Sequence, residues 1–239
     1  MSMDLPAAPK SHGKVIPKLY PEEKIVEEAE RLINAIKQPE RWTLEHCKTI
    51  AAYTLEINEL KKLKDVYLIA HSYQTPDIIY GVADEVSDSY SLSKSARDAK
   101  QQIILFSSVR FMAETAKILS PDKLVIHPSP EAGCSLSESI TAKDVKELKK
   151  KYPGVPVACY INTTAEVKAE VDVCVTSSNY LKICENLPGD KLIFVPDRFM
   201  GEHLQKSLAG KKDVIIYDGV CEVCLLYTSP SPRDATLSR

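Results

Sequence analysis

Short apolar runs alternate with helical stretches along the chain from residue 66 onward. The runs are three to five residues long and end in polar residues. This alternation is typical of a parallel β-sheet whose strands are joined by crossover helices. The predicted strands are 66–70, 103–106, 124–126, 155–158, 171–175, 192–195 and 214–216. Predicted helices between them include 88–99, 111–119 and 144–151, and Thr141 stands three residues before Asp144 in a near capping box.

The segment before residue 66 has the pattern of two amphipathic helices. Pro21 opens the first helix, in which acidic residues occupy the first turn and apolar residues recur on one face. Thr43 caps the second helix, which runs toward Leu63. The first 20 or so residues are rich in Pro and Lys without periodicity, so we expect a flexible lead-in.

The α/β part of the chain contains a weak internal repeat. A Ser-Ser pair, a helix and a strand ending in Pro occur over residues 107–128 and again over residues 177–196. The sequence therefore predicts an α/β fold of repeated three-layer α/β/α domains with parallel sheets. The predicted boundaries are 1–64 for the lead-in and two helices, 65–143 for the first α/β domain, 144–223 for the second and 224–239 for a tail.

The end of the chain breaks this pattern. Residues 227–239 are polar, contain two Ser-Pro steps and continue neither a strand nor a helix. We expect residues 224–239 to be a non-native tail, of out-of-frame or adapter origin, on a C-terminally truncated gene. The uninterrupted gene is then expected to continue for about one more module of this size.

Composition narrows the function without defining it. The 239 residues have a formal net charge of −2, which gives no reason to expect nucleic acid or an anionic membrane as a partner. No stretch approaches the ~20 apolar residues of a membrane span, and the N-terminus has no secretory signal. Seven cysteines without a short-range pairing pattern are typical of free thiols or metal ligands. We therefore expect a cytoplasmic protein.

Two cysteines follow predicted strands at similar places in the two repeats. Cys134 comes after the strand 124–126, and Cys221 comes after the strand 214–216. Ligands collect at the carboxyl ends of the strands of parallel α/β sheets, so both thiols are expected to face a site. If the two domains face a common axis, Cys134 and Cys221 present a shared metal centre.

Polar residues follow several other predicted strands. They are His71-Ser-Tyr-Gln74, Asp88-Ser89, Tyr160-Ile-Asn162 and Thr176-Ser-Ser-Asn179. Hydroxyl groups and free N–H groups at helix starts bind anions, which makes Ser89 and Ser177 candidates for holding a phosphate or carboxylate. Simple helix capping is the alternative interpretation of each serine.

The remaining cysteines have structural interpretations. Cys174 lies in an apolar strand and Cys184 on a helix, so we expect both in the core. Cys159 is expected to point away from the face that bears Tyr160. Cys47 belongs to the apolar stripe of the second helix, and Cys224 forms a Cys-x-x-Cys spacing with Cys221.

Eight sequence motifs occur in order between residues 71 and 197. They are His71-Ser-Tyr-Gln-Thr-Pro76, Gly81-Val-Ala-Asp84, Asp88-Ser89, Phe111-Met-Ala-Glu-Thr-Ala-Lys-Ile-Leu119, Glu131-Ala-Gly-Cys-Ser-Leu136, Asn162-Thr-Thr-Ala-Glu-Val-Lys168, Thr176-Ser-Ser-Asn179 and Phe194-Val-Pro-Asp197. Together they resemble the quinolinate synthase family (iron–sulfur quinolinate synthetase A), an enzyme family of de novo NAD biosynthesis. The resemblance covers about residues 44–223.

The resemblance implies three similar domains around a pseudo-threefold axis, with one [4Fe-4S] cluster at the centre. Cys134 and Cys221 match two of the three cysteine ligands, and the third domain with the third cysteine is missing here. The open iron of such a cluster is implied to act as a Lewis acid. The chain departs from the family pattern where Cys224 stands in place of a His close after Cys221.

The implied reaction is a transferase reaction that condenses iminoaspartate with dihydroxyacetone phosphate. By motif, His71 and Tyr73 are the acid/base groups, and His71 also contacts substrate. Ser89 and Ser177 are implied to hold phosphate or carboxylate, and Tyr160 and Asn162 to orient the substrate. A functional link to L-aspartate oxidase or aspartate dehydrogenase follows, because one of them supplies iminoaspartate.

Two other functions stay open. A cluster-free module that binds a phosphorylated metabolite predicts full tolerance of Cys134→Ser and Cys221→Ser; an inactive fragment is a further alternative. A structural zinc protein predicts a site of Cys134, Cys221 and Cys224. Tetrahedral zinc is colourless, whereas an iron–sulfur cluster is brown, so a visible spectrum after anaerobic reconstitution distinguishes them.

Overall fold

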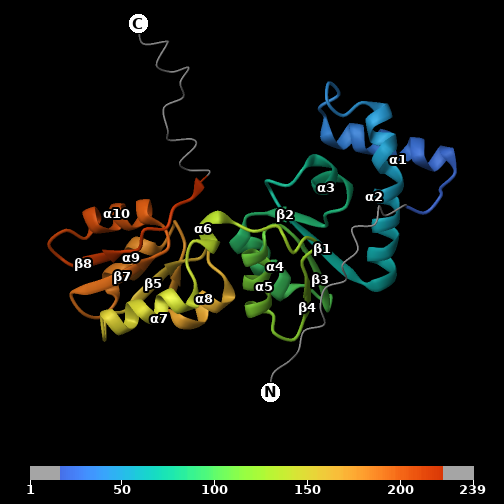
Figure 1. Ribbon diagram of the computed structural model, residues 1–239. Helices are drawn as coiled ribbons and strands as arrows, with labels where there is room; N and C mark the ends of the chain where they lie inside the picture. The colour runs from blue at the N-terminus through green and yellow to red at the C-terminus, as the bar shows by residue number, and fades with distance from the viewer. Residues whose placement is uncertain (1–16, 223–239) are drawn as a thin grey trace, which may run out of the picture. The chain divides into compact units, whose positions relative to one another are not determined.

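The computed structural model describes residues 17–222 and divides into two units (Figure 1). The first unit contains residues up to Lys64 together with Thr75–Ala83, and the second contains Asp65–Gln74 together with the chain from Asp84 onward. The expected non-native tail, with Cys224, and most of the expected lead-in lie outside the described residues. The four-part domain division made from the sequence stays a prediction.

The first unit is helical. Its helices are α1 (Glu22–Ile36), α2 (Leu44–Lys64) and α3 (Pro76–Gly81). The first two begin directly after Pro21 and Thr43, as predicted. The carboxylate of Glu28 is buried between them, where it accepts hydrogen bonds from Arg31 Nε at 2.7 Å and Thr54 Oγ1 at 2.6 Å. The apolar contact between α1 and α2 buries Ala29, Leu32, Ile36, Cys47 and Ala51.

The second unit contains two parallel four-stranded sheets with the same strand order. The first sheet has the order β2-β1-β3-β4 and the second the order β6-β5-β7-β8, so each repeat places its first strand between its second and third. This shared topology confirms the repeat predicted from the sequence. The strands are β1 (Val66–His71), β2 (Glu85–Ser87), β3 (Ile103–Ser107), β4 (Leu124–Ile126), β5 (Val157–Tyr160), β6 (Val173–Val175), β7 (Lys191–Val195) and β8 (Asp213–Ile216).

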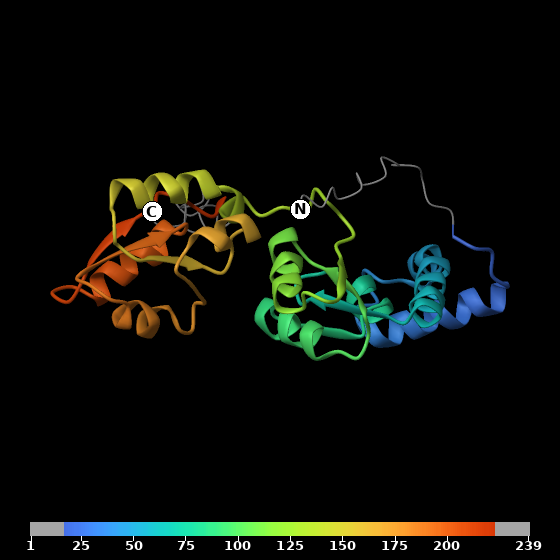
Figure 2. The ribbon, with the colours of Figure 1, turned by 90° about the horizontal axis from the view of Figure 1, so that it is seen from below.

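Helices cover both faces of the second sheet, which confirms the three-layer α/β/α arrangement for this repeat (Figure 2). Alternate residues of β7 point to opposite faces: Phe194 packs with α9 and α10, and Ile193 packs with α7 and α8. In the first sheet α4 and α5 pack over Ile69, Ile104 and Phe106. The helices of this unit are α4 (Ser89–Asp98), α5 (Arg110–Leu119), α6 (Ser135–Glu138), α7 (Ala142–Lys151), α8 (Ala165–Glu170), α9 (Tyr180–Asn186) and α10 (Arg198–Ser207).

The strand β2 and the starts of β5 and β6 differ from the sequence expectation, since β6 begins at Val173 and not at residue 171. β2 is missed because Glu85-Val-Ser87 has a single apolar residue. β5 begins at Val157, two residues later than predicted, because Pro156 has no N–H to donate to the ladder. In the described part of the chain, no helix has both the length and the apolar character needed to cross a membrane.

The start of α7 has the predicted capping box. Asp144 N donates to Thr141 Oγ1 at 3.3 Å, and Thr141 N donates back to Asp144 Oδ2 at 2.8 Å. Replacing Thr141 with Ala removes one of these acceptors and is expected to lower the free energy of unfolding by about 1 kcal/mol. Urea denaturation followed by circular dichroism measures this change.

The matched control for this prediction is Lys143→Ala on the same helix. The Lys143 side chain is exposed and has a long ion pair with Glu147 at 3.9 Å, so its replacement is expected to change stability by less than about 0.5 kcal/mol. Equal urea midpoints for Thr141→Ala and Lys143→Ala would show that the box does not stabilise α7.

Candidate functional site

A polar cavity of about 550 Å³ lies at the carboxyl ends of the strands. Three segments line it: the start of α4, the end of β5 and the turn that leads from β6 to α9. The cavity brings together Ser89, Tyr160 and Ser177, three of the residues selected from the sequence. The full lining is Asp88, Ser89, Tyr90, Tyr160, Ile161, Thr176, Ser177, Ser178 and Asn179.

Neither Ser89 nor Ser177 is a helix N-cap. Asp88 caps α4, and its carboxylate accepts from Tyr90 N at 2.9 Å and Ser91 N at 3.0 Å. Asn179 is the N-cap residue of α9. The alternative of simple capping is therefore wrong for both serines, and Asp88 already accepts from two of the N–H groups at the start of α4.

The turn before α9 presents a group of hydroxyl and amide side chains. Asn179 Oδ1 accepts from Thr176 N at 2.7 Å, which closes the turn. The hydroxyls of Thr176 and Ser178 lie 2.9 Å apart. Thr176, Ser178 and Asn179 were not selected from the sequence, although all three stand in the same polar run as Ser177. Tyr90, which stands two positions after the capping residue Asp88, was missed as well.

His71 and Tyr73 form a stacked pair at the end of β1. Their ring centroids are 4.0 Å apart at an interplanar angle of 30°, and Tyr73 N donates to His71 Nδ1 at 3.3 Å. The Tyr73 hydroxyl accepts from Val109 N at 2.9 Å. The structure therefore brings these two predicted acid/base groups together, although neither lines the cavity.

Burial sets the protonation of this pair. Desolvation lowers the pKa of His71, and the negative charge of Asp88 partly opposes this shift. Burial raises the pKa of Tyr73, and the charge of Cys134 adds to that rise. Near neutral pH His71 is therefore neutral and able to accept a proton, while Tyr73 retains the proton that it can donate.

Asn162 lies apart from the cavity lining. It is partly buried in the loop between β5 and α8, two residues after Tyr160. The structure thus places Tyr160 on the cavity and Asn162 just beyond it. Its predicted contact with substrate stays a prediction.

Cys134 lies in a tightly packed loop that ends at α6. It is the residue immediately before α6 and is partly exposed. A Cβ at the preceding Gly133 would meet the Glu138 carboxylate, the end of a flexible side chain that can move aside. Arg110 N donates to Ala132 O at 2.9 Å and anchors the loop to the start of α5.

The segment that leads to Cys221 packs against Ser139, the residue that follows α6. Tyr217 Oη donates to Ser139 O at 3.0 Å. A Cβ at Gly219 would lie 2.6 Å from Ser139 Oγ and would also meet Pro196 O. Ser139 directly follows α6, so the segments that carry Cys134 and Cys221 touch, as the end of the described chain beside α6 indicates (Figure 1).

Cys134 and Cys221 provide the kind of donor atom that a metal cluster needs. Both are free thiols and partly exposed, so ligands can reach them. Within residues 17–222, no group of three or more His, Cys, Asp or Glu side chains is arranged to hold a metal ion. Cys134 and Cys221 are therefore donors of the right chemistry for a cluster that needs further ligands.

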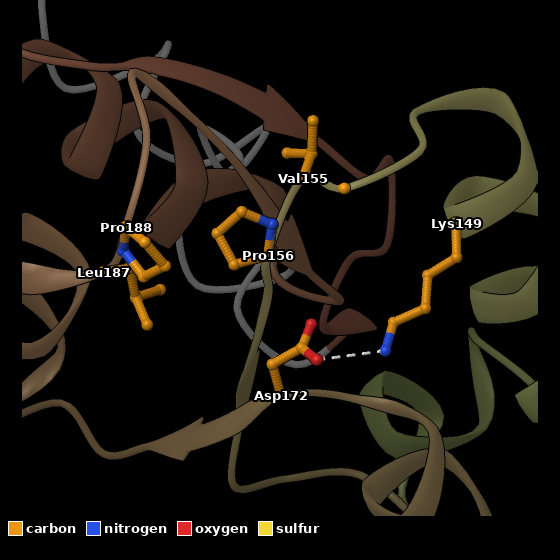
Figure 3. A pocket seen from close by; sticks show the side chains of 7 residues that line it. Lys149, Val155, Pro156, Asp172, Leu187 and Pro188 are labelled. Atoms are coloured by element: carbon orange, nitrogen blue, oxygen red, sulfur yellow. Dashed lines mark hydrogen bonds and ion pairs between the residues drawn. The ribbon is translucent and has the colours of Figure 1, made fainter.

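A second hollow, of about 370 Å³, lies at the opposite ends of the strands (Figure 3). The charged groups of Lys149 and Asp172 pair across it at 3.2 Å. Val155, Pro156, Leu187 and Pro188 supply the rest of the labelled wall. The two labelled charges of this hollow are paired with each other. It also lacks the converging hydroxyls of the first cavity, so it is the weaker candidate for a binding site.

The fold and the site define a class of protein. Repeated parallel α/β modules with a polar cavity and free thiols at the carboxyl ends of strands are typical of proteins that bind small metabolites. The family model for quinolinate synthetase A proteins matches residues 55–231 of the chain. The chain therefore belongs to the quinolinate synthetase A family, as its motifs predicted.

Curated relatives agree with this assignment. Quinolinate synthase of Sinorhizobium medicae (strain WSM419) is 46% identical over 179 residues, which are 75% of this chain and 49% of that protein. The protein of the same name from Caulobacter vibrioides (strain NA1000 / CB15N) is 45% identical over 77% of this chain and 51% of its own length. That of Aquifex aeolicus (strain VF5) is 44% identical over 78% and 56%. The chain spans about half the length of the curated relatives it matches.

The electrostatic coupling of Asp88 to His71 can be tested by titration. Replacing Asp88 with Asn keeps a capping oxygen for α4 but removes the charge that favours protonated His71. The pKa of His71 is therefore expected to fall below its value in the unaltered chain. Nuclear magnetic resonance of labelled histidine measures that pKa directly.

The matched control is Asp98→Asn at the other end of α4. Asp98 is exposed and pairs with Arg97 at 2.7 Å. Its replacement is expected to leave the His71 titration unchanged. A His71 pKa that is unchanged or higher in Asp88→Asn would contradict the coupling.

Proposed function

We propose that the chain forms the substrate-binding part of a quinolinate synthase that condenses iminoaspartate with dihydroxyacetone phosphate in de novo NAD biosynthesis. The observation that carries this proposal is the cavity where Ser89, Tyr160 and Ser177 meet. These three residues come from segments far apart in the sequence, and all belong to or adjoin the family motifs. Family membership supports the reaction, which is a transferase reaction.

In this proposal the cavity binds the phosphate of dihydroxyacetone phosphate. Ser89 and Ser177 donate hydroxyl hydrogen bonds to phosphate oxygens, with Thr176 and Ser178 close by. Hydrogen bonds to charged groups contribute more than neutral ones, about 1.5–3 kcal/mol each. The carboxylate of Asp88 lines the same cavity and accepts hydrogen bonds from Tyr90 N and Ser91 N at the start of α4.

His71 and Tyr73 move protons in this proposal. Neutral His71 accepts a proton from the substrate, and Tyr73 donates its hydroxyl hydrogen to an oxygen atom that leaves as water. The contact between their rings places the two groups side by side. Tyr160 and Asn162 orient the substrate by hydrogen bonds from their side chains.

Cys134 and Cys221 hold two irons of a [4Fe-4S] cluster in this proposal. When bound, the cluster supplies an open iron that acts as a Lewis acid. The contacts of Tyr217 and Gly219 with Ser139 support the pairing, because they join the two cysteine-bearing segments. A pseudo-threefold arrangement with a third domain and a third cysteine belongs to the same proposal.

The chemistry of the substrates indicates the setting of the reaction. Iminoaspartate comes from the oxidation of aspartate, so L-aspartate oxidase or aspartate dehydrogenase is the proposed source. Both substrates are small anions of central metabolism, and we propose a cytoplasmic location. The proposal includes neither a nucleic acid nor a membrane partner.

Binding of dihydroxyacetone phosphate tests the proposal. Isothermal titration calorimetry is expected to show binding to the unaltered chain, weakened about tenfold or more in Ser89→Ala and in Ser177→Ala. Ser207→Ala, at the exposed end of α10, is the matched control and is expected to bind as the unaltered chain does. Equal affinity in all four proteins, or no binding at all, would overturn the assignment of this cavity.

A further inference from the structure

Two cysteines outside the site described above face each other across neighbouring strands. Cys159 on β5 is directly paired with Cys174 on β6, and their sulfur atoms lie 3.4 Å apart. Neighbouring strands lie about 4.8 Å apart, within the range of roughly 4.4–6.8 Å between Cα atoms that disulfides span. The pair is therefore placed so that a small side-chain movement closes a covalent bond.

The two thiols differ in their access to solvent. Cys174 is exposed, because β6 is the edge strand of its sheet. The expectation that Cys174 lies in the core is therefore wrong. Cys159 is fully buried among Val157, Ile193 and their neighbours, on the face away from Tyr160 as predicted. A reagent in solution therefore reaches Cys174 before it reaches the buried Cys159.

The surroundings of the pair favour a thiolate on Cys174. The hydrogen bond with the Cys159 thiol lowers the pKa of Cys174, and the positive charge of Lys168 lowers it further. The thiolate of Cys174 in turn raises the pKa of Cys159, together with burial. Lys168 is held in place by a hydrogen bond to Thr163 O and by the ring of Phe111, 5.6 Å away.

We propose that Cys159 and Cys174 are a redox-active dithiol that small-molecule disulfides convert reversibly into a disulfide. The Cys174 thiolate attacks a disulfide such as oxidised glutathione, forms a mixed disulfide and releases one glutathione thiolate. The Cys159 thiol, after losing its proton, then attacks the Cys174 sulfur and releases the second glutathione thiolate. The chain loses two electrons, and two protons and two electrons end on the two glutathione molecules.

This disulfide lies next to the cavity. Tyr160 directly follows Cys159, and Thr176 comes two residues after Cys174. A covalent link between β5 and β6 therefore fixes the two segments that carry Tyr160 and Ser177 into the cavity. The proposal itself does not depend on what the cavity binds.

Peptide mapping tests the proposal on the full chain. The purified protein is reduced, transferred to oxidised and reduced glutathione at defined ratios, and quenched with acid. Its free thiols are then alkylated in denaturant before digestion with trypsin. Cys159 and Cys174 fall on separate single-cysteine peptides, residues 152–168 and 169–182, and Cys184 falls on a third. We expect the first two peptides to become linked, with the loss of two alkylatable thiols, and dithiothreitol to restore both.

Two variants distinguish this mechanism from non-specific oxidation. Cys159→Ser is expected to stop at the mixed disulfide, with glutathione retained on Cys174. Cys184→Ala is the matched control, because burial raises the pKa of Cys184 to about 11 and makes it a poor nucleophile; it is expected to leave the linkage unchanged. Persistent alkylation of both thiols in the unaltered chain, a stable glutathione adduct on Cys174 there, or linkage of Cys159 to another cysteine would overturn the proposal.

Discussion

The packing of Gly219 and Tyr217 against Ser139 is the contact on which the proposed metal centre depends. Ser139 directly follows α6, whose first residue follows Cys134, and Gly219 stands two residues before Cys221. The close approach to Ser139 Oγ is possible because Gly219 has no Cβ. In the proposed centre, this contact joins the two segments that carry the thiols, one from each repeat.

The second requirement is that the hydroxyls of Ser89 and Ser177 are not used to cap a helix. Asp88 caps α4, and Asn179, not Ser177, occupies the N-cap position of α9. Their side-chain oxygens accept from the backbone N–H groups of Tyr90, Ser91 and Thr176. Ser89 and Ser177 are thereby left to face the cavity, where an anionic ligand can accept their hydrogen bonds.

Features that arise from local sequence patterns could be predicted, whereas features that depend on how distant parts of the chain pack could not. The longer strands, the capping box at Thr141 and the repeat were predicted because local patterns cause them. The exposure of Cys174 was not, because it depends on β6 being an edge strand, which is a property of the sheet. The meeting of Ser89 with Ser177 depends on how the two repeats pack, so the family motifs implied it and periodicity did not.

The convergence of Cys134 and Cys221 is the central claim, and a short reagent that bridges two thiols tests it most directly. The chain with Cys224→Ser is treated with dibromobimane and digested with trypsin, so that Cys134 and Cys221 each fall on a peptide with one cysteine, residues 124–143 and 213–233. The account predicts that these two peptides are joined. Separate, singly modified peptides would contradict it, because thiols that do not approach each other cannot bind one cluster.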